Sequence, residues 1–168
     1  MESEEGLIDD QLTAAAVGVV LLIAVFNVSS FYLSDRTVEP FSELGILGPN
    51  QKIADYPTNV LAGQNFTLYL YVGNHEGRVM YYQVLAKLGN VSSVSNDNVS
   101  LSVPPIASFG MVLLDNQTYL KPITLSLLHS GTNIRLIFEL WDYQANVTSF
   151  AYDHRQNQLF MNVTGSSI

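Results

Sequence analysis

Residues 65–73 read NFTLYLYVG, a stretch in which apolar and polar side chains alternate with a period of two. Its apolar members, Phe66, Leu68, Leu70 and Val72, share one side of an extended chain, which is the pattern of a half-buried β-strand. The turn-forming residues NHEG follow at 74–77, and a second alternating stretch occupies residues 78–88. We therefore predict an antiparallel pair of strands joined by a four-residue hairpin connection.

The same rhythm continues on both sides of this pair. Further short strands are expected at residues 44–47, 99–103, 111–114, 119–128, 134–143 and 159–163, where apolar stretches are bounded by Gly, Pro, Asn or Asp. Residues 89–98 are expected to be a polar loop, and residues 144–157 a long loop or ragged hairpin. No amphipathic helix interrupts the series. The sequence therefore predicts an all-β, immunoglobulin-like antiparallel β-sandwich, without the Cys and Trp hallmarks of antibody domains.

A long apolar stretch precedes the predicted strands. Residues 12–33 read LTAAAVGVVLLIAVFNVSSFYL, and no charged residue falls between Asp10 and Asp35. As a helix they measure about 33 Å, which is enough to cross a hydrocarbon core of ~30 Å. A cleaved signal peptide is disfavoured because the stretch lacks a cationic leader and a small-x-small cleavage site. A buried core helix is disfavoured because every face is apolar.

We therefore expect four parts in the chain. They are an acidic cytoplasmic tail at residues 1–11, disordered at its start, a single transmembrane helix at 12–33, a linker at 34–42 and an extracellular β-sandwich domain at 43–168. Within the helix, Ala14, Ala15 and Gly18 offer small side chains against which another membrane helix would pack.

Seven Asn-x-Ser/Thr tripeptides indicate which side of the membrane the domain occupies. Asn27 lies inside the apolar stretch, and the other six follow it: Asn65, Asn90, Asn98, Asn116, Asn146 and Asn162. The Asn, Ser and Thr content predicts about two such tripeptides by chance. The positive-inside rule is silent, because the tail has no Lys or Arg and Arg36 lies just beyond the helix. The excess of acceptor sites predicts an external, N-glycosylated domain.

Composition excludes several classes of function. The net charge is −8 and no basic cluster is present, so the sequence predicts no nucleic-acid partner. Cysteine is absent, which excludes disulfides and thiolate sites. The few ionisable groups of the domain predict a stability that changes little with pH. The partners expected instead are the membrane, other surface or membrane proteins, and N-glycans.

One segment of the chain resembles a known family. Its matching elements are LGP at residues 47–49, DYPTN at 55–59, Gly63, and NHEG at 74–77 followed by a Tyr-rich strand. These elements resemble the mainly archaeal membrane-protein family catalogued as domain of unknown function 1616. The resemblance implies an extracytoplasmic β-sandwich with no established activity, and it brings no catalytic residues. Members of the family often have several membrane spans, so a single span is a departure from the pattern.

Candidate catalytic and metal-binding groups are few. His75, His129 and His154 lie in separate segments without metal-ligand spacing. Glu139 and Asp142 are the one carboxylate pair considered for glycoside chemistry, but Asp142 resembles a turn former. The sequence contains neither a Gly-rich phosphate loop nor a nucleophile elbow. It therefore predicts a protein that is not an enzyme and has no cofactor or metal.

Tyrosines provide the one candidate contact surface. Tyr69 and Tyr71 share a strand face, and Tyr81 or Tyr82 is expected to join them from the partner strand, forming a contact patch for protein or glycan. The alternative is that these side chains pack a second face of the sheet.

Three functions are consistent with this reading. The leading hypothesis is a single-pass, glycosylated cell-surface protein whose domain makes structural or adhesive contacts. The first alternative is an accessory subunit of a respiratory or transport complex, with its helix packed on other spans. The second is a pilin-like filament subunit.

Overall fold

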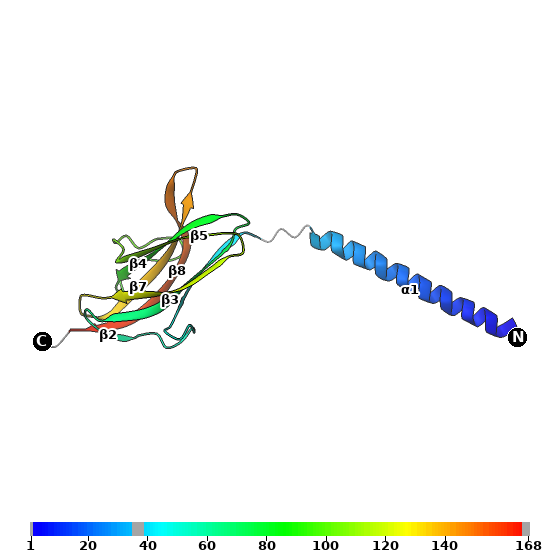
Figure 1. The fold of residues 1–168 in the computed structure, drawn as a ribbon, viewed down its shortest axis with the longest axis horizontal. Helices are drawn as coiled ribbons and strands as arrows, with labels where there is room; N and C mark the ends of the chain where they lie inside the picture. Colours follow the sequence, from blue (N-terminus) through cyan, green and yellow to red (C-terminus); the bar gives the residue numbers. More distant parts are fainter. Residues whose placement is uncertain (1, 35–38, 166–168) are drawn as a thin grey trace. The chain divides into compact units, whose positions relative to one another are not determined.

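A computed structural model describes residues 2–34 and 39–165, which form two compact units. Of the linker expected at 34–42, residues 35–38 lie outside the described residues, Ser34 is the last residue of the helix, and the first strand already begins at Phe41. The first unit contains the single helix α1 (Glu2–Ser34), and the second contains eight strands (Figure 1).

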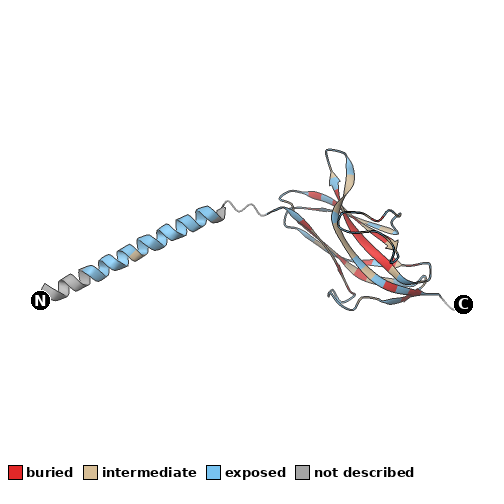
Figure 2. Cartoon of the chain, turned by 180° about the vertical axis from the view of Figure 1, so that it is seen from behind, coloured by how far each residue is buried: buried red, intermediate tan, exposed pale blue. Residues whose placement is uncertain are grey.

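Helix α1 has the length and composition of one membrane span or of a signal sequence. The apolar part, Asp10–Tyr32, has no buried residue, as the pale helix in Figure 2 shows. Its polar residue Asn27 donates from Nδ2 to the carbonyl oxygen of Ile23 at 2.7 Å, so the amide is hydrogen-bonded within the helix itself. The helix begins at Glu2, so the prediction of a disordered start is wrong. Each added residue gains a hydrogen bond once a helix has nucleated, which favours extension into the acidic segment.

The second unit is a β-sandwich. Its strands are β1 (Phe41–Leu47), β2 (Asn59–Leu61), β3 (Asn65–His75), β4 (Met80–Gly89), β5 (Ala107–Leu113), β6 (Thr118–Ser126), β7 (Gly131–Gln144) and β8 (Ser149–Thr164). One sheet has the order β1-β3-β6, and the other has the order β2-β8-β7-β4-β5. All pairings are antiparallel except that of β2 with β8. This arrangement confirms the predicted immunoglobulin-like sandwich, in which β1 of one sheet contacts β8 of the other and β6 contacts β5.

The core lies between the two sheets (Figure 2). Alternate residues of the long strands point into it, including Leu68 and Leu70 of β3, Tyr82 of β4 and Phe138 of β7, all of them fully buried. These are the apolar positions of the alternating stretches, so the burial of one face per strand follows from the period of two.

The predicted pairing of residues 65–73 with 78–88 is wrong. These segments are β3 and β4, and they belong to opposite sheets. The buried side chain of Asn74 shapes the crossing between them, because it donates to the carbonyl oxygens of Arg78 and Leu113 at 2.8 and 3.0 Å and accepts from the Glu76 backbone N–H at 3.0 Å. Gly77 adopts a φ of +69°, as the turn signal predicts.

One further strand prediction differs from the structure, and one alternative is decided by it. The strand expected at 99–103 is absent, and an isolated bridge between Asn96 and Val99 stands in its place, because Pro104 and Pro105 remove the ladder donors that a longer strand needs. Of the two alternatives expected for residues 144–157, a loop or a ragged hairpin, the structure confirms the hairpin: it is formed by β7 and β8, and its tip extends beyond the other strands in Figure 1.

Residues 90–106, called here the covering segment, lie over part of the outer face of the five-stranded sheet. Two charged residues of the sheet hold this segment, Lys87 of β4 and Glu139 of β7. They form an ion pair with each other, Nζ to Oε2 at 2.8 Å, and their side chains are 5% and 0% exposed. Lys87 also donates to the Leu101 carbonyl oxygen at 2.8 Å, and Glu139 Oε1 accepts from the Leu101 backbone N–H at 2.6 Å. The segment is therefore attached to the sheet by buried charge.

Candidate functional site

The six predicted glycosylation sites all lie on the surface of the sandwich. The asparagines at 65, 90, 98, 116, 146 and 162 are exposed. Two domain asparagines are not exposed, Asn74 and Asn157, and neither belongs to an Asn-x-Ser/Thr tripeptide. The tripeptides therefore coincide with positions at which a bulky sugar would be sterically accommodated.

The six sites differ in how their amides are engaged. Asn116 Oδ1 lies 3.1 Å from His75 Nδ1, and Asn162 Oδ1 accepts from the Asn133 backbone N–H at 2.9 Å. Asn90 Oδ1 accepts from the backbone N–H and the hydroxyl of Ser92. The side chains of the other three, at 65, 98 and 146, make no hydrogen bond within the described part of the chain. Asn65 and Asn146 lie at opposite ends of the sandwich, in line with the strand register.

The structure contradicts the predicted tyrosine patch. Tyr69 and Tyr71 lie on the outer face of the three-stranded sheet, whereas Tyr81 and Tyr82 belong to the other sheet. Tyr82 is fully buried, and its hydroxyl lies 2.8 Å from Ser42 Oγ and donates to Asn74 Oδ1 at 3.2 Å. Burial raises the pKa of Tyr82 to about 12. The patch fails because β3 and β4 are not neighbours.

Tyr81 instead belongs to an aromatic row across the five-stranded sheet. The strand pairings place Tyr81 of β4 opposite Val112 of β5 and Tyr143 of β7 opposite Phe150 of β8, and the ring centroids of Tyr81 and Tyr143 are 6.0 Å apart. Ring centroids are 4.9 Å apart for Tyr81 and Phe150 and 5.4 Å apart for Tyr143 and Phe150. The row was missed because residues 144–157 were interpreted as a loop or a ragged hairpin, with no strand assigned to Phe150. The alternation of Phe150 and Tyr152 was the available signal.

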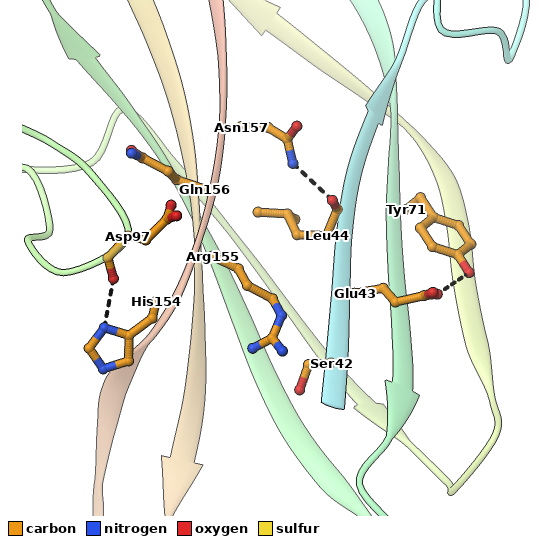
Figure 3. Close-up of a pocket in the computed structure, with 9 residues that line it drawn as sticks. All are labelled: Ser42, Glu43, Leu44, Tyr71, Asp97, His154, Arg155, Gln156 and Asn157. Carbon is orange, nitrogen blue, oxygen red and sulfur yellow. Dashed lines mark hydrogen bonds between the residues drawn. The ribbon is translucent and has the colours of Figure 1, made fainter. Parts of the chain in front are cut away.

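A polar cleft lies between β1 of one sheet and β8 of the other. Its volume is about 520 Å³. It is lined by Ser42, Glu43, Leu44, Tyr71, Asp97, His154, Arg155, Gln156 and Asn157 (Figure 3). The two strands are joined there by Asn157 Nδ2, which donates to the Leu44 carbonyl oxygen at 2.8 Å.

A β-bulge in β8 directs the side chains of His154 and Arg155 toward this cleft. The β7–β8 register shifts between Glu139 and Trp141, and His154 adopts a φ of 60°. A bulge of this kind redirects the side chains of the bulged strand. His154 Nδ1 lies 2.6 Å from the Asp97 carbonyl oxygen, while Arg155 Nη1 donates to the carboxylate of Asp153 at 3.0 Å. In Figure 3 the Arg155 guanidinium extends into the space between β1 and β8.

The opposite wall of the cleft carries a carboxylate. Glu43 Oε2 accepts a hydrogen bond from the Tyr71 hydroxyl at 2.6 Å and lies 3.5 Å from His75 Nε2. The hydrogen bond to Glu43 raises the pKa of Tyr71, so this hydroxyl remains a donor. Together with the Gln156 and Asn157 amides, the cleft offers the mixed donors and acceptors that bind polar ligands.

A second carboxylate, that of Asp153, is paired with Arg155 next to the cleft. Burial raises the pKa of Asp153 to about 6, even though the neighbouring Arg155 opposes the shift. Burial also raises the pKa of Asp142. The charge on Asp153 therefore changes in a mildly acidic range, close to the cleft.

The groups weighed for catalysis and metal binding are separated. Glu139 is buried under the covering segment, and Asp142 is hydrogen-bonded to Gln144 on the opposite side of β7. His75 ends β3 at one end of the sandwich, and His129 follows β6 at the other end. Among the described residues, no three His, Asp or Glu side chains converge as metal ligands.

The predicted helix-packing residues are on the surface of α1. Ala14 and Ala15 are exposed, and Gly18 is partly exposed, with no atom within 4 Å of a Cβ built on it. Helix packing at these positions remains a prediction.

Comparison with known proteins yields one family and several structural similarities. The model of the family described as Domain of unknown function (DUF1616) matches residues 36–162, which confirms the resemblance seen in the sequence. No curated protein sequence matches the chain.

The solved structures that are similar share little sequence with this chain. The CARDB domain of a Pyrococcus furiosus protein, crystallised in complex with di-metal ions, is 10% identical with a TM-score of 0.47, over 76% of this chain and 94% of that one. A β-glucosidase from Listeria innocua is 12% identical with a TM-score of 0.45, over 77% of this chain and 16% of that one. One chain from the crystal structure of the complex formed between Zinc 2-glycoprotein and Prolactin inducible protein, from human seminal plasma, is 8% identical with a TM-score of 0.43. The similarity covers 79% of this chain and 99% of that one.

Proposed function

The chain belongs to the family described as Domain of unknown function (DUF1616), and from this premise and the geometry of its domain we propose that it is a single-pass, N-glycosylated cell-surface protein. The immunoglobulin-like domain lies outside the membrane and makes structural or adhesive contacts without catalysing a reaction. The family prescribes no activity, and the sandwich and the helix themselves support the proposal.

The observation that carries the proposal is the position of the acceptor sites. All six tripeptide asparagines that follow the helix are exposed, while the two less exposed asparagines of the domain lie outside the tripeptides. An acceptor buried in the core would prevent folding once glycosylated, because the core is closely packed. The sandwich therefore tolerates a glycan at every site.

Helix α1 supplies the membrane attachment. Its span Asp10–Tyr32 leaves Asn27 as a polar residue in the apolar stretch. Asn27 donates to the Ile23 carbonyl oxygen, and this bond reduces the cost of placing the amide in or near hydrocarbon. The acidic segment then lies on the cytoplasmic side and the domain on the external side.

The polar cleft is the surface that we assign to partner contacts. Glu43 and Arg155 offer opposite charges on facing strands, and Gln156 and Asn157 add amide groups. A protein loop or a glycan has the mixed polarity that such groups recognise. Replacing Arg155 by Gln would remove the cation while leaving the strand pairing intact.

Glycopeptide mapping of the full chain, purified from membranes of its native source, tests the proposal. Glycans are expected at several of the six exposed sites and not at Asn27, which serves as the internal control. Complete absence of glycan from all six sites overturns the external placement.

The assembly state separates the proposal from its alternatives. The full chain is extracted in mild detergent, and its native mass is measured. A particle of one chain with its glycans fits a single-pass surface protein. Co-purification with a stoichiometric set of membrane subunits, or recovery as filaments, replaces the proposal with the complex-subunit or the pilin-like function.

A further inference from the structure

The aromatic row leaves an uncovered hollow at one end of the five-stranded sheet. Tyr81 is 45% exposed and Tyr143 is 37% exposed, although their rings contact Phe150. The hollow has a volume of about 510 Å³, within the range of small-molecule sites, roughly 300–1,000 Å³. The covering segment lies over Lys87, Glu139 and neighbouring positions, so it does not supply this cover.

A glycosylation site opens directly into this hollow. Asn146 lines it together with Tyr81, Val112 and Tyr143 of the aromatic row. Tyr143 precedes Asn146 by three residues, and the hairpin tip returns through the Gln144–Ser149 pair. The Asn146 side chain is exposed and makes no hydrogen bond among the described residues, so its Nδ2 is available for a sugar.

The chemistry of a sugar suits these rings. One face of a hexopyranose presents C–H groups, and the faces of Tyr and Phe rings carry negative charge that attracts them. A glycan on Asn146 is tethered beside the rings, so its effective concentration is on the order of millimolar or higher. Weak stacking is therefore sufficient to keep the sugar in place. An untethered partner has no such advantage.

We propose that the glycan on Asn146 folds back onto the surface formed by Tyr81, Tyr143 and Phe150. Its first sugars cover the aromatic row and hold the tip of the β7–β8 hairpin. The inference rests on the proposed function, because it requires that the domain be glycosylated. It adds a specific role for one site, which differs from the solubilising role of the others.

Chemical nitration of tyrosine measures this cover. The glycosylated full chain is treated with tetranitromethane, and modification of Tyr81 and Tyr143 is followed by mass spectrometry. Both are expected to react several-fold faster in the Asn146→Gln variant. The matched variant Asn65→Gln, at the opposite end of the sandwich, is expected to leave both rates unchanged, and Tyr69 serves as an internal reference. Equal rates in the wild type and Asn146→Gln overturn the proposal.

Thermal unfolding provides a second, independent measurement. Asn146→Gln is expected to lower Tm by about 2–5 °C, the scale of one modest contact in a domain of this size. Asn65→Gln is expected to lower it less. In the Tyr143→Leu variant the Tm decrease caused by Asn146→Gln is expected to be smaller, because part of the stacking surface has been removed. An equally large Tm decrease in that variant contradicts stacking of the sugar on the rings.

Glycopeptide mapping distinguishes failure of this inference from failure of the proposed function. Glycans at other sites but none on Asn146 refute the inference alone, whereas none at any of the six sites refutes both. Protection of Tyr81 that persists in Asn146→Gln and grows with protein concentration assigns the surface to a second copy of the chain, which also overturns the inference.

Discussion

Replacing Glu139 by Gln is expected to destabilise the domain by about 3–5 kcal/mol, because it leaves a buried cation without its counter-charge. Glu139 Oε2 lies 2.8 Å from Lys87 Nζ, and the two side chains are 0% and 5% exposed. Lys87 would keep its bonds to the Ser100 hydroxyl and the Leu101 carbonyl oxygen, but neither neutralises its charge. Such a loss is a large part of a typical stability of about 5–15 kcal/mol.

The reciprocal variant and the double variant measure the coupling between the two charges. Lys87→Met leaves the Glu139 carboxylate buried, with donors from Ser100, Leu101 and Trp141. It is also expected to cost about 3–5 kcal/mol. The double variant is expected to cost less than the sum of the single variants by about 1–3 kcal/mol, because each single change strands the partner that the other removes.

The assay is urea unfolding of the full chain at pH 7, followed by tryptophan fluorescence. Trp141 is the single tryptophan of the chain, its Nε1 donates to Glu139 Oε2 at 3.2 Å, and Lys87 Nζ lies 5.3 Å from the centroid of its ring. The signal therefore arises beside the ion pair. Lys52→Met, at an exposed lysine, is the control, with an expected change below about 0.5 kcal/mol. Costs below about 1 kcal/mol for both single variants would show that water screens the pair and that the covering segment is not held by it.

Three further perturbations are expected to give measurable changes. Because burial raises the pKa of Asp153 to about 6 from 3.8, the folded chain binds this proton more tightly than the unfolded chain, so stability should fall as pH rises from about 4 to about 6. Asp153→Asn should remove up to about 3 kcal/mol of this decline, and equal slopes in a pH series of urea unfolding would contradict the assignment. Tyr82→Phe should cost about 1–2 kcal/mol in urea unfolding, because the buried Asn74 oxygen and the Ser42 hydroxyl each lose a partner; a neutral effect would mean that water replaces the hydroxyl. Gly77→Ala should cost about 1 kcal/mol at a φ of +69°, and Gly63→Ala, at a φ of +80° in open space, provides a matched comparison.

The pH prediction differs from the expectation drawn from composition. Few ionisable groups in the domain predicted a flat dependence of stability on pH. The Asp153 side chain is partly buried at the β8 bulge. A count of charged residues does not show which of them are buried. The raised pKa of Asp153 is therefore expected to dominate the pH dependence of stability, which composition alone predicts to be weak.

Of the candidate surfaces, the glycan acceptor tripeptides can be found from the sequence, whereas the polar cleft can be found only from the fold. The acceptor tripeptides are covalent motifs, so they were found by reading the chain, and the structure adds that all six are exposed. The cleft unites β1, β3, β8 and the covering segment. Its residues Asp97 and Arg155 carry no local pattern that would have singled them out.

The sequence by itself determined the local elements of this protein. The apolar stretch specified α1, the period of two specified β3 and most of β7, and the residues at 47–63 and 74–77 indicated the family. Each of these features depends on neighbouring residues only, because backbone periodicity and turn chemistry act over a few positions.

The tertiary structure alone decided which strands are partners. An alternating strand buries the same face whether its successor pairs with it or crosses to the opposite sheet, so 65–73 and 78–88 were compatible with both arrangements. The buried hydrogen bonds of Asn74 and the closure of the core between the sheets favour the crossing. That choice separates Tyr71 from Tyr81, and it places Tyr81 beside Tyr143 and Phe150, next to the acceptor tripeptide of Asn146.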